Sequence, residues 1–292
     1  MTNAFTTIGL IGKYADASVG DCLKSICAYL QDRGLRVILD EHTATLWPRS
    51  GLETGDYHLL GARCDLAIVI GGDGTLLNAA RALADFGVPL LGVNLGRLGF
   101  LTDVSSDETS SRLGAILSGD YLSEERFLLH AGVVRAGRLL HEGDALNDVV
   151  IHKWETARMI ECETHVNGRF VNTHRSDGVI VATPTGSTAY ALSGGGPIVH
   201  PTLDAIVLVP ICPHTLSNRP IVVSAASEIE IVLHPSHDGR AQMTCDGQVT
   251  QPLLPGDRVV VRKKERRIRL IHPRGYDYFD ILRAKLRWGG HP

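Results

Sequence analysis

Gly71-Gly72-Asp73-Gly74-Thr75 is the stretch around which the first half of the chain is organised. The apolar run 66–70 (Leu-Ala-Ile-Val-Ile) leads into it, and residues 76–83 leave it with the composition of a helix. The order is therefore strand, glycine turn, helix. Glycines give the backbone room to approach a ligand closely. The N–H groups at the start of the helix lie at the positive end of its dipole, which suits phosphate.

The acid in this turn needs its own explanation, because a carboxylate repels the phosphate that the turn would otherwise attract. Asp73 is better suited to act as a base, or as part of a metal site, beside a bound phosphate.

Length and composition limit the classes of protein. The chain has 292 residues, of which 44% are hydrophobic, so one large or two medium domains are expected. Lys and Arg number 29 against 32 Asp and Glu, which gives no basic excess for nucleic acid. Apolar runs such as 205–211 are too short to span a membrane. Residues 1–7 lack the pattern of a secretory signal, so a cytoplasmic protein is the default expectation.

The first 120 residues alternate between strand and helix patterns. Such alternation implies a parallel sheet that helices cover on both faces, with ligands binding beyond the carboxyl ends of the strands. Two glycine-rich segments, 71–75 and 94–99, follow predicted strands and lie at that edge. The other expected elements are strands at 7–12, 35–39 and 88–93, a helix from about Val19 to Leu30 capped by Gly34, a loop at 41–57, and a helix from a capping box at Ser105 and Glu108 to about Leu117.

After about residue 122 short β patterns replace the helical ones. Asn167-Gly168 between two such runs predicts a tight hairpin. The tail 276–288 has helical spacing and is expected to pack back onto the first domain. The sequence therefore predicts an α/β domain at 1–121, joined by 272–292, and a β-rich domain at 122–271. Further strands are expected at 178–182, 205–210, 229–234, 258–262 and 267–271.

Two short polar motifs could bind a sugar or a charged group. Asn147 and Asp148 could grip vicinal hydroxyls, although a turn at a strand start explains them better in isolation. Arg175 and Asp177 precede a strand, and a surface turn with a local ion pair explains them equally simply.

The block Thr183–Pro197 (TPTGSTAYALSGGGP) is more specific. Five hydroxyl residues, four glycines and a Tyr suit phosphate and ribose, with Tyr190 placed to cover a ring. A flexible Ser/Gly linker is the alternative, but a strand leads directly into the block and its apolar residues do not fit a tether. By contrast, the basic cluster 262–267 is interpreted as a solvated hairpin tip.

Taken together, these stretches resemble the NAD kinase family, over nearly the whole chain and in the family's order. The turn 71–75 also resembles that of diacylglycerol-type lipid kinases, so the block 183–197 makes the resemblance specific. The resemblance implies a Rossmann-like N-terminal domain and a β-sandwich-like C-terminal domain. It also implies a homo-oligomer, a dimer or a tetramer.

The implied reaction transfers the γ-phosphoryl group of ATP to the 2′-hydroxyl of the adenosine ribose of NAD and gives NADP, with Mg²⁺ bridging the donor phosphates. The resemblance makes Asp73 the general base, with Gly74 leaving room for diphosphate and ribose. The direct metal ligands stay open, as do other nucleoside triphosphates or polyphosphate as donors and NADH as acceptor.

The resemblance also assigns the other binding residues. Asn147 and Asp148 hold the ribose or adenine, and Arg175 and Asp177 contact the nicotinamide end. Asp148 stands where the family usually has Glu, and its shorter arm allows a direct contact to become water-mediated. The remaining contacts implied are Arg158, Thr188, Ala189, Tyr190, Ala191, Leu192, Ser193 and Gln248.

Two other functions compete with an NAD kinase. A lipid kinase is disfavoured because the block 183–197 does not fit that family and the sequence shows no lipid-binding helix. A nucleotide sensor without catalysis is disfavoured by Asp73, because a pure sensor gains nothing from a carboxylate that faces phosphates.

Overall fold

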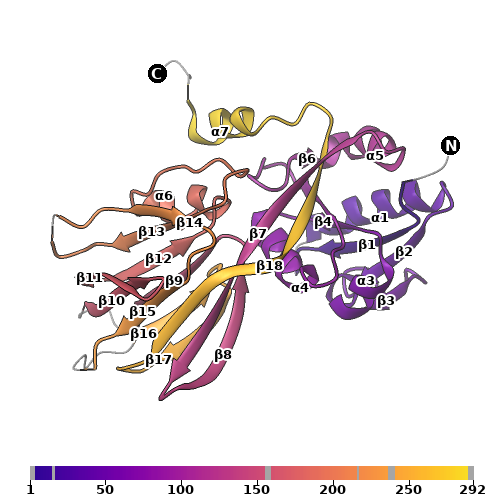
Figure 1. Cartoon of the computed structure of the whole chain (residues 1–292). Helices are drawn as coiled ribbons and strands as arrows, with labels where there is room; N and C mark the ends of the chain where they lie inside the picture. The colour runs from indigo at the N-terminus through magenta and orange to yellow at the C-terminus, as the bar shows by residue number, and fades with distance from the viewer. Residues whose placement is uncertain (1–3, 15–16, 155–158, 216, 236–240, 289–292) are drawn as a thin grey trace. The chain divides into compact units, whose positions relative to one another are not determined.

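The computed structural model describes residues 4–14, 17–154, 159–215, 217–235 and 241–288. The chain divides into two compact units (Figure 1). Unit 1 comprises residues 1–125 and 268–292, and unit 2 comprises residues 126–267. The boundaries predicted from the sequence, after residues 121 and 271, each lie four residues from these.

Unit 1 is built on a parallel sheet with the strand order β5-β4-β1-β2-β3. The short strand β6 and the last residues of β18, Leu270 and Ile271, also pair with β5 in parallel. Strands β4 and β5 are buried along their whole length, as expected for a sheet covered on both faces. The strands are β1 (Thr7–Gly12), β2 (Arg36–Asp40), β3 (Glu53–Gly55), β4 (Leu66–Ile70), β5 (Leu90–Asn94) and β6 (Val104–Ser105).

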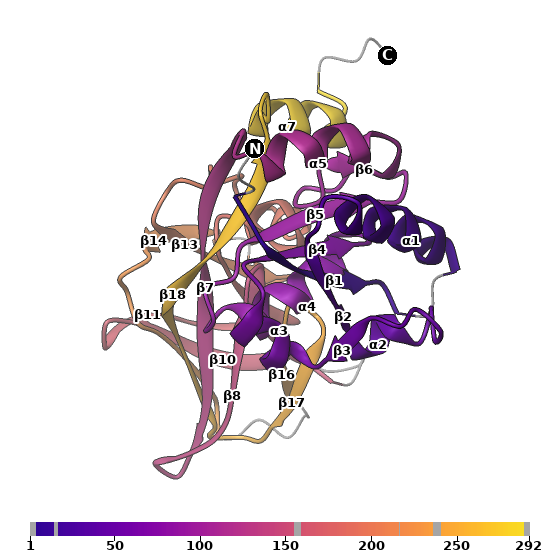
Figure 2. The same cartoon turned by 90° about the vertical axis from the view of Figure 1, so that its right-hand side faces the viewer.

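Helices cover the two faces of this sheet (Figure 2). On one face, the apolar sides of α1 and α5 share a core with Ile8, Leu10 and Ile68. On the other, Leu60 of α3 and Leu76 of α4 contact the sheet at its glycines, Gly9 and Gly92. The helices are α1 (Ala17–Gln31), α2 (Glu41–Ala44), α3 (Tyr57–Arg63), α4 (Asp73–Leu83), α5 (Thr109–Leu117) and α7 (Tyr278–Leu286).

Two local predictions for unit 1 were wrong. The segment 41–57 is not a plain loop, because Asp40 caps the one-turn helix α2 and β3 pairs with β2. The expected capping box also fails, since the Ser105 side chain makes no cap hydrogen bond and the 3₁₀ turn Ser106–Glu108 precedes α5.

Unit 2 consists of two antiparallel sheets. One has the order β11-β10-β15-β18, with β7 joining β18 to β8, and the other has the order β14-β13-β12-β9-β16-β17. The strands are β7 (Tyr121–Arg135), β8 (Arg138–Ala145), β9 (Asp148–Lys153), β10 (Ile160–Val166), β11 (Arg169–Ser176), β12 (Gly178–Ala182), β13 (Ala205–Ile211), β14 (Ile221–Ser224), β15 (Ile229–Leu233), β16 (Ala241–Cys245), β17 (Val249–Leu253) and β18 (Arg258–Pro273).

A single core joins the two sheets into a sandwich. Ile229 and Ile231 of β15 meet Val179 and Val181 of β12 in this core. Strand β15 alternates between buried and half-buried residues, whereas β12 is buried throughout. The difference arises because the short helix α6 (Tyr190–Ser193) and its neighbours cover the outer face of β12. The predicted combination of a parallel-sheet domain with a β-sandwich domain is confirmed.

The hairpin at Asn167-Gly168 is confirmed, with φ values of 51° and 71° at its two turn residues. The prediction of a hairpin tip at 262–267 is wrong, because β18 runs without interruption from Arg258 to Pro273. The tail does form a helix, α7, and the Lys285 ammonium donates to the Leu98 carbonyl at 2.8 Å within unit 1. None of the helices in the described part of the chain is long and apolar enough to cross a membrane.

Gly34 ends α1 in a left-handed conformation, with φ 72°. The Gly34 N–H donates to Gln31 and the Leu35 N–H to Leu30, the paired bonds of a Schellman cap. No heavy atom lies within 4 Å of a Cβ added at Gly34 or at Gly20, which lies inside the same helix. We expect Gly34→Ala to lower the free energy of unfolding by about 1 kcal/mol through backbone strain. The control Gly20→Ala should raise it by up to about 1 kcal/mol.

Chemical denaturation of the two variants measures both effects. If both substitutions changed the free energy of unfolding in the same direction, the left-handed cap at Gly34 would be contradicted.

Candidate functional site

Asp73 is the first residue of α4, directly after the N-cap residue Gly72. Its carboxylate accepts hydrogen bonds from the backbone N–H groups of Phe100 at 2.9 Å and Leu101 at 3.0 Å. The Thr102 hydroxyl adds a longer contact of 3.3 Å. The second glycine segment therefore fixes the direction of the carboxylate.

The segment Asn94–Asp103, here called the acceptor loop, is shaped to reach Asp73. The Asn94 side chain closes the loop by donating to the Thr102 carbonyl and accepting from the Gly96 N–H, at 3.0 and 3.1 Å. A Cβ at Gly99 would overlap the Asp73 carboxylate. Glycine at this position is thus required by the close approach of the acid.

This arrangement does not use the whole hydrogen-bonding capacity of the Asp73 carboxylate. An ionised carboxylate offers about four acceptor positions, and protein groups occupy three of them. Among the described residues no donor occupies the fourth position, so it is open to a further hydroxyl. Gly74, the next predicted site residue, lies exposed beside Asp73 in the first turn of α4.

Unit 2 contains a pocket of about 480 Å³ that brings four predicted site residues together. Asn147 and Asp148 come from the start of β9, and Ala189 and Tyr190 from the block that follows β12. Tyr190 is 47% exposed. The other lining residues are Val150, His152, Gln242, Thr244, Asp246, Gly247 and Thr250.

Asp246 holds one wall of this pocket in place, and it was not among the site residues predicted from the sequence. Its carboxylate accepts the backbone N–H groups of Leu146, Asn147 and Asp148 at 2.7 to 3.2 Å. Asp246 and Gly247 both have positive φ and form the turn between β16 and β17. The Asp-Gly pair between two β runs was the available signal for the turn.

Asp148 lies in an unusual electrostatic environment. Its side chain is almost fully buried, and it shares the pocket with the Asp246 carboxylate. Burial, with a smaller contribution from the Asp246 charge, raises the pKa of Asp148 to about 7.

Several hydroxyls of the block 183–197 serve the fold. The Thr183 hydroxyl donates to the Leu146 carbonyl at 2.6 Å, and the Ser187 hydroxyl accepts from the Val199 N–H at 2.9 Å. Thr185 accepts from the buried Arg126 guanidinium at 3.1 Å. The block is therefore a fixed wall against the 146–148 segment rather than a flexible tether.

The other predicted residues of this block differ in exposure. Ala191 is fully buried and packs on the outer face of β12, and its carbonyl accepts from the Gly196 N–H at 2.8 Å, so it is not exposed to a ligand. The Thr188 hydroxyl donates to the Thr185 carbonyl, Leu192 is half-buried and Ser193 is exposed. Gln248 is exposed and follows the turn formed by Asp246 and Gly247.

The motif at 175–177 does not line this pocket. Arg175 lies 3.8 Å from Glu161, and the Asp177 carboxylate lies 2.7 Å from the Lys153 ammonium. The two residues therefore pair with neighbouring strands and not with each other. Arg158 lies outside the described residues.

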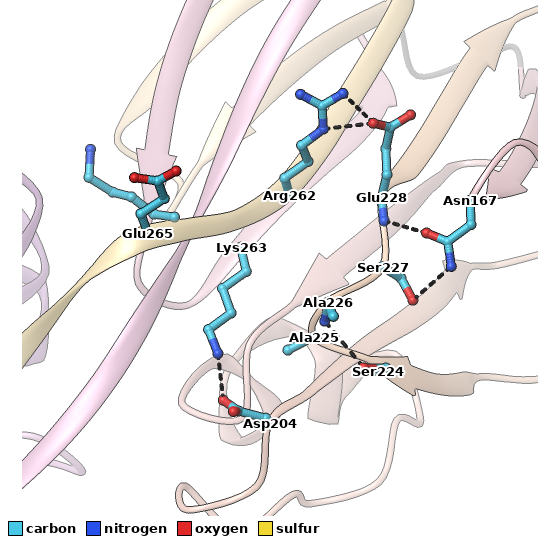
Figure 3. Close-up of a pocket in the computed structure, with 11 residues that line it drawn as sticks. Asn167, Asp204, Ser224, Ala225, Ala226, Ser227, Glu228, Arg262, Lys263 and Glu265 are labelled. Carbon is cyan, nitrogen blue, oxygen red and sulfur yellow. Dashed lines mark hydrogen bonds and ion pairs between the residues drawn. The ribbon is translucent and has the colours of Figure 1, made fainter.

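The basic cluster lines a separate hollow of about 530 Å³ in unit 2 (Figure 3). Its cations face acids from distant segments: Arg262 pairs with Glu228, and Lys263 lies 2.8 Å from Asp204. None of the predicted substrate residues lines this hollow. Because its positive charges are paired within the protein, the hollow is a poorer nucleotide site than the Asn147 pocket.

Comparisons with known proteins identify the family of both units. Residues 8–121 match the ATP-NAD kinase N-terminal domain, and residues 146–273 match the ATP-NAD kinase C-terminal domain. The NAD kinase of Chromohalobacter salexigens is 54% identical over 284 residues, covering 97% of each chain. That of Nitrosococcus oceani is 52% identical over 289 residues, covering 99% of each chain.

Solved structures show the same fold. Yeast NADH kinase complexed with NADH superposes with a TM-score of 0.91 at 26% identity, covering 99% of this chain and 90% of that one. An NAD kinase from Archaeoglobus fulgidus in complex with ATP gives 0.75 at 28% identity, covering 97% and 99%. The comparisons give no support to a lipid kinase or a sensor. By its sequence, its two domains and its fold, the chain belongs to the NAD kinase family.

Proposed function

We propose that the protein transfers the γ-phosphoryl group of ATP to the 2′-hydroxyl of the adenosine ribose of NAD, with Asp73 as the general base. The orientation of Asp73 carries this proposal, because two backbone N–H groups and the Thr102 hydroxyl aim the carboxylate and leave one acceptor position for the 2′-hydroxyl. As the hydroxyl oxygen attacks the γ-phosphorus, its proton passes to Asp73, and the bond to ADP breaks. Such a transfer depends mainly on positioning and charge neutralisation.

In unit 2 the proposal assigns NAD to the pocket around Asn147. Asn147 and Asp148 hold the ribose or adenine through amide and carboxyl hydrogen bonds, and Tyr190 covers a ring. The pocket volume of about 480 Å³ suits one part of a dinucleotide. The complexes of the relatives with NADH and with ATP support these two ligand classes.

A divalent cation fits the proposed reaction as a partner of the donor phosphates. The described residues contain no group of three His, Cys, Asp or Glu side chains that could enclose a metal. Mg²⁺ needs no such cage, since it keeps several waters and binds substrate phosphates with one or two carboxylates. Its chemistry here is to neutralise charge on the phosphates.

A direct assay tests the function. Purified protein with NAD, ATP and Mg²⁺ should form NADP, which an NADP-specific dehydrogenase detects. Parallel reactions with NADH as acceptor and with polyphosphate as donor define the substrate range. No product above a blank in any arm would refute the proposal.

The base role predicts the effect of Asp73→Asn. The amide cannot take a proton from the hydroxyl, so kcat should fall by ~10²–10⁴-fold. NAD affinity in the unit 2 pocket should stay within about threefold of wild type. The control Asp107→Asn removes an exposed acid of the same unit and should leave kcat unchanged. Steady-state kinetics and calorimetric NAD binding measure both quantities, and near wild-type turnover in Asp73→Asn would exclude the base role.

The raised pKa of Asp148 predicts pH-dependent binding. The ionised carboxylate is the stronger acceptor for ribose hydroxyls, so NAD affinity should rise as pH increases through about 7. Asp148→Asn should abolish this step. Asp246→Asn should move it to lower pH, because it removes a charge that raises the Asp148 pKa. Calorimetric titrations between about pH 6 and about pH 8 measure it, and the same step in Asp148→Asn would contradict the assignment.

The same shift has the opposite effect on the free protein. The unfolded chain releases the Asp148 proton near its ordinary pKa, whereas the folded chain holds it up to about 7. This group therefore removes stability as pH rises between these two values.

The proposal includes a homo-oligomer, in which Arg175 and Asp177 contact the nicotinamide end across a subunit boundary. Light scattering of the purified protein measures the mass and separates a monomer from a dimer or a tetramer.

A further inference from the structure

A buried charge cluster in unit 1 lies directly behind the acceptor loop. His272 is the second-to-last residue of β18, directly before Pro273, and is 1% exposed. Its Nδ1 atom lies 3.0 Å from the Asp103 carboxylate, and its Nε2 atom lies 3.4 Å from the Glu124 carboxylate. The Tyr276 ring stacks on the imidazole with 3.8 Å between the ring centroids.

The two acids of the cluster favour protonation of His272. The Asp103 and Glu124 side chains are 6% and 20% exposed, so two carboxylates that are largely shielded from solvent face one imidazole. Burial alone lowers the pKa of His272, but hydrogen bonding and the charges of Asp103 and Glu124 outweigh it, so the pKa is raised. The two acids therefore favour the protonated form of the imidazole, whose Nδ1 pairs with Asp103 and whose Nε2 faces Glu124.

Asp103 is the last residue of the acceptor loop and connects the cluster to the site. Its neighbour Thr102 touches the Asp73 carboxylate, and Leu101 and Phe100 donate to it. Asn94 closes the other end of the loop. The loop is thus anchored at Asn94, at Leu98 by the Lys285 ammonium, and at Asp103 by His272. The partners of Leu98 and Asp103 both come from the C-terminal segment.

We propose that His272 is a positioning residue for phosphoryl transfer, which acts by holding Asp103 and so fixing the acceptor loop that aims Asp73. This inference rests on the proposed role of Asp73. It assigns a function to a histidine that no sequence motif singled out. Loss of the anchor should displace the base without altering the unit 2 pocket.

Two variants test the contact between His272 and Asp103, one from each side. His272→Gln keeps a neutral donor but cannot be protonated, and Asp103→Asn keeps the shape of the loop residue but removes its carboxylate. Each should lower kcat by about 10- to 100-fold, because small misplacements of a catalytic group are costly. The KM for NAD should stay within about twofold, since the NAD pocket is unchanged. The double variant should lose no more than the stronger single variant, because both break one contact.

The matched control is Arg274→Gln, two residues beyond His272. Arg274 pairs with Asp120 at 2.7 Å, both side chains are exposed, and neither residue belongs to the acceptor loop. Its kcat should stay within about twofold of wild type, as expected for an exposed ion pair. Circular dichroism and melting curves establish that each variant is folded, and if His272→Gln does not fold, Asp103→Asn decides alone.

Unchanged kcat in folded Asp103→Asn, additive losses in the double variant, or an equal loss in Arg274→Gln would each overturn the positioning role. The wild-type reaction separates this outcome from a failure of the proposed function. Active variants of an active wild type refute only the role of His272, whereas a wild type that forms no NADP refutes the function itself.

Discussion

The hydrogen bonds from the Phe100 and Leu101 backbones to the Asp73 carboxylate are the constraint on which the chemistry of unit 1 depends. They hold an acid at a helix start that would otherwise attract phosphate. They also explain why a second glycine segment follows β5, since only a loop with glycine at position 99 can approach the carboxylate this closely. The turn at 71–75 follows β4 and the acceptor loop follows β5, and the two segments together form one site around Asp73.

Unit 2 meets a different physical demand. A dinucleotide pocket needs polar groups in fixed positions, and the sandwich supplies them by burying the surroundings of Asn147 rather than Asn147 itself. Thr183 and Asp246 hold the 146–148 segment from two sides through its carbonyl and N–H groups. The cost is a buried carboxylate beside a second one, and this environment raises the pKa of Asp148 to about 7. The backbone of a pocket built in this way is held by hydrogen bonds, and the charge of the pocket depends on pH near 7.

The parts of the fold that could be predicted are those encoded locally. The strand 66–70, the cap at Gly34 and the hairpin at Asn167-Gly168 each follow from neighbouring residues. The missed parts depend on distant partners. A run such as Arg262–Arg267 resembles a solvated tip until Glu228 and Asp204 are seen opposite its cations. Similarly, α2 and β3 are too short for a periodic pattern and are specified by the Asp40 cap and by pairing with β2.

The site shows the same division. Asp73, Asn147, Asp148 and Tyr190 could be named because their motifs are contiguous in sequence. Asp246 contacts residues about a hundred positions earlier, and His272 lies 169 positions from Asp103, so no local pattern reveals these contacts, although the Asp-Gly pair does indicate the turn at Asp246. Their roles follow from burial and charge, which only the folded chain displays.

A crystal structure with bound NAD tests the central claim most directly. The account predicts an Asp73 carboxylate oxygen within about 2.6–3.2 Å of the 2′-oxygen of the adenosine ribose, with the Phe100 and Leu101 N–H groups still donating to it. A 2′-oxygen beyond the reach of Asp73, with another side chain in hydrogen-bond contact with it, would contradict the account.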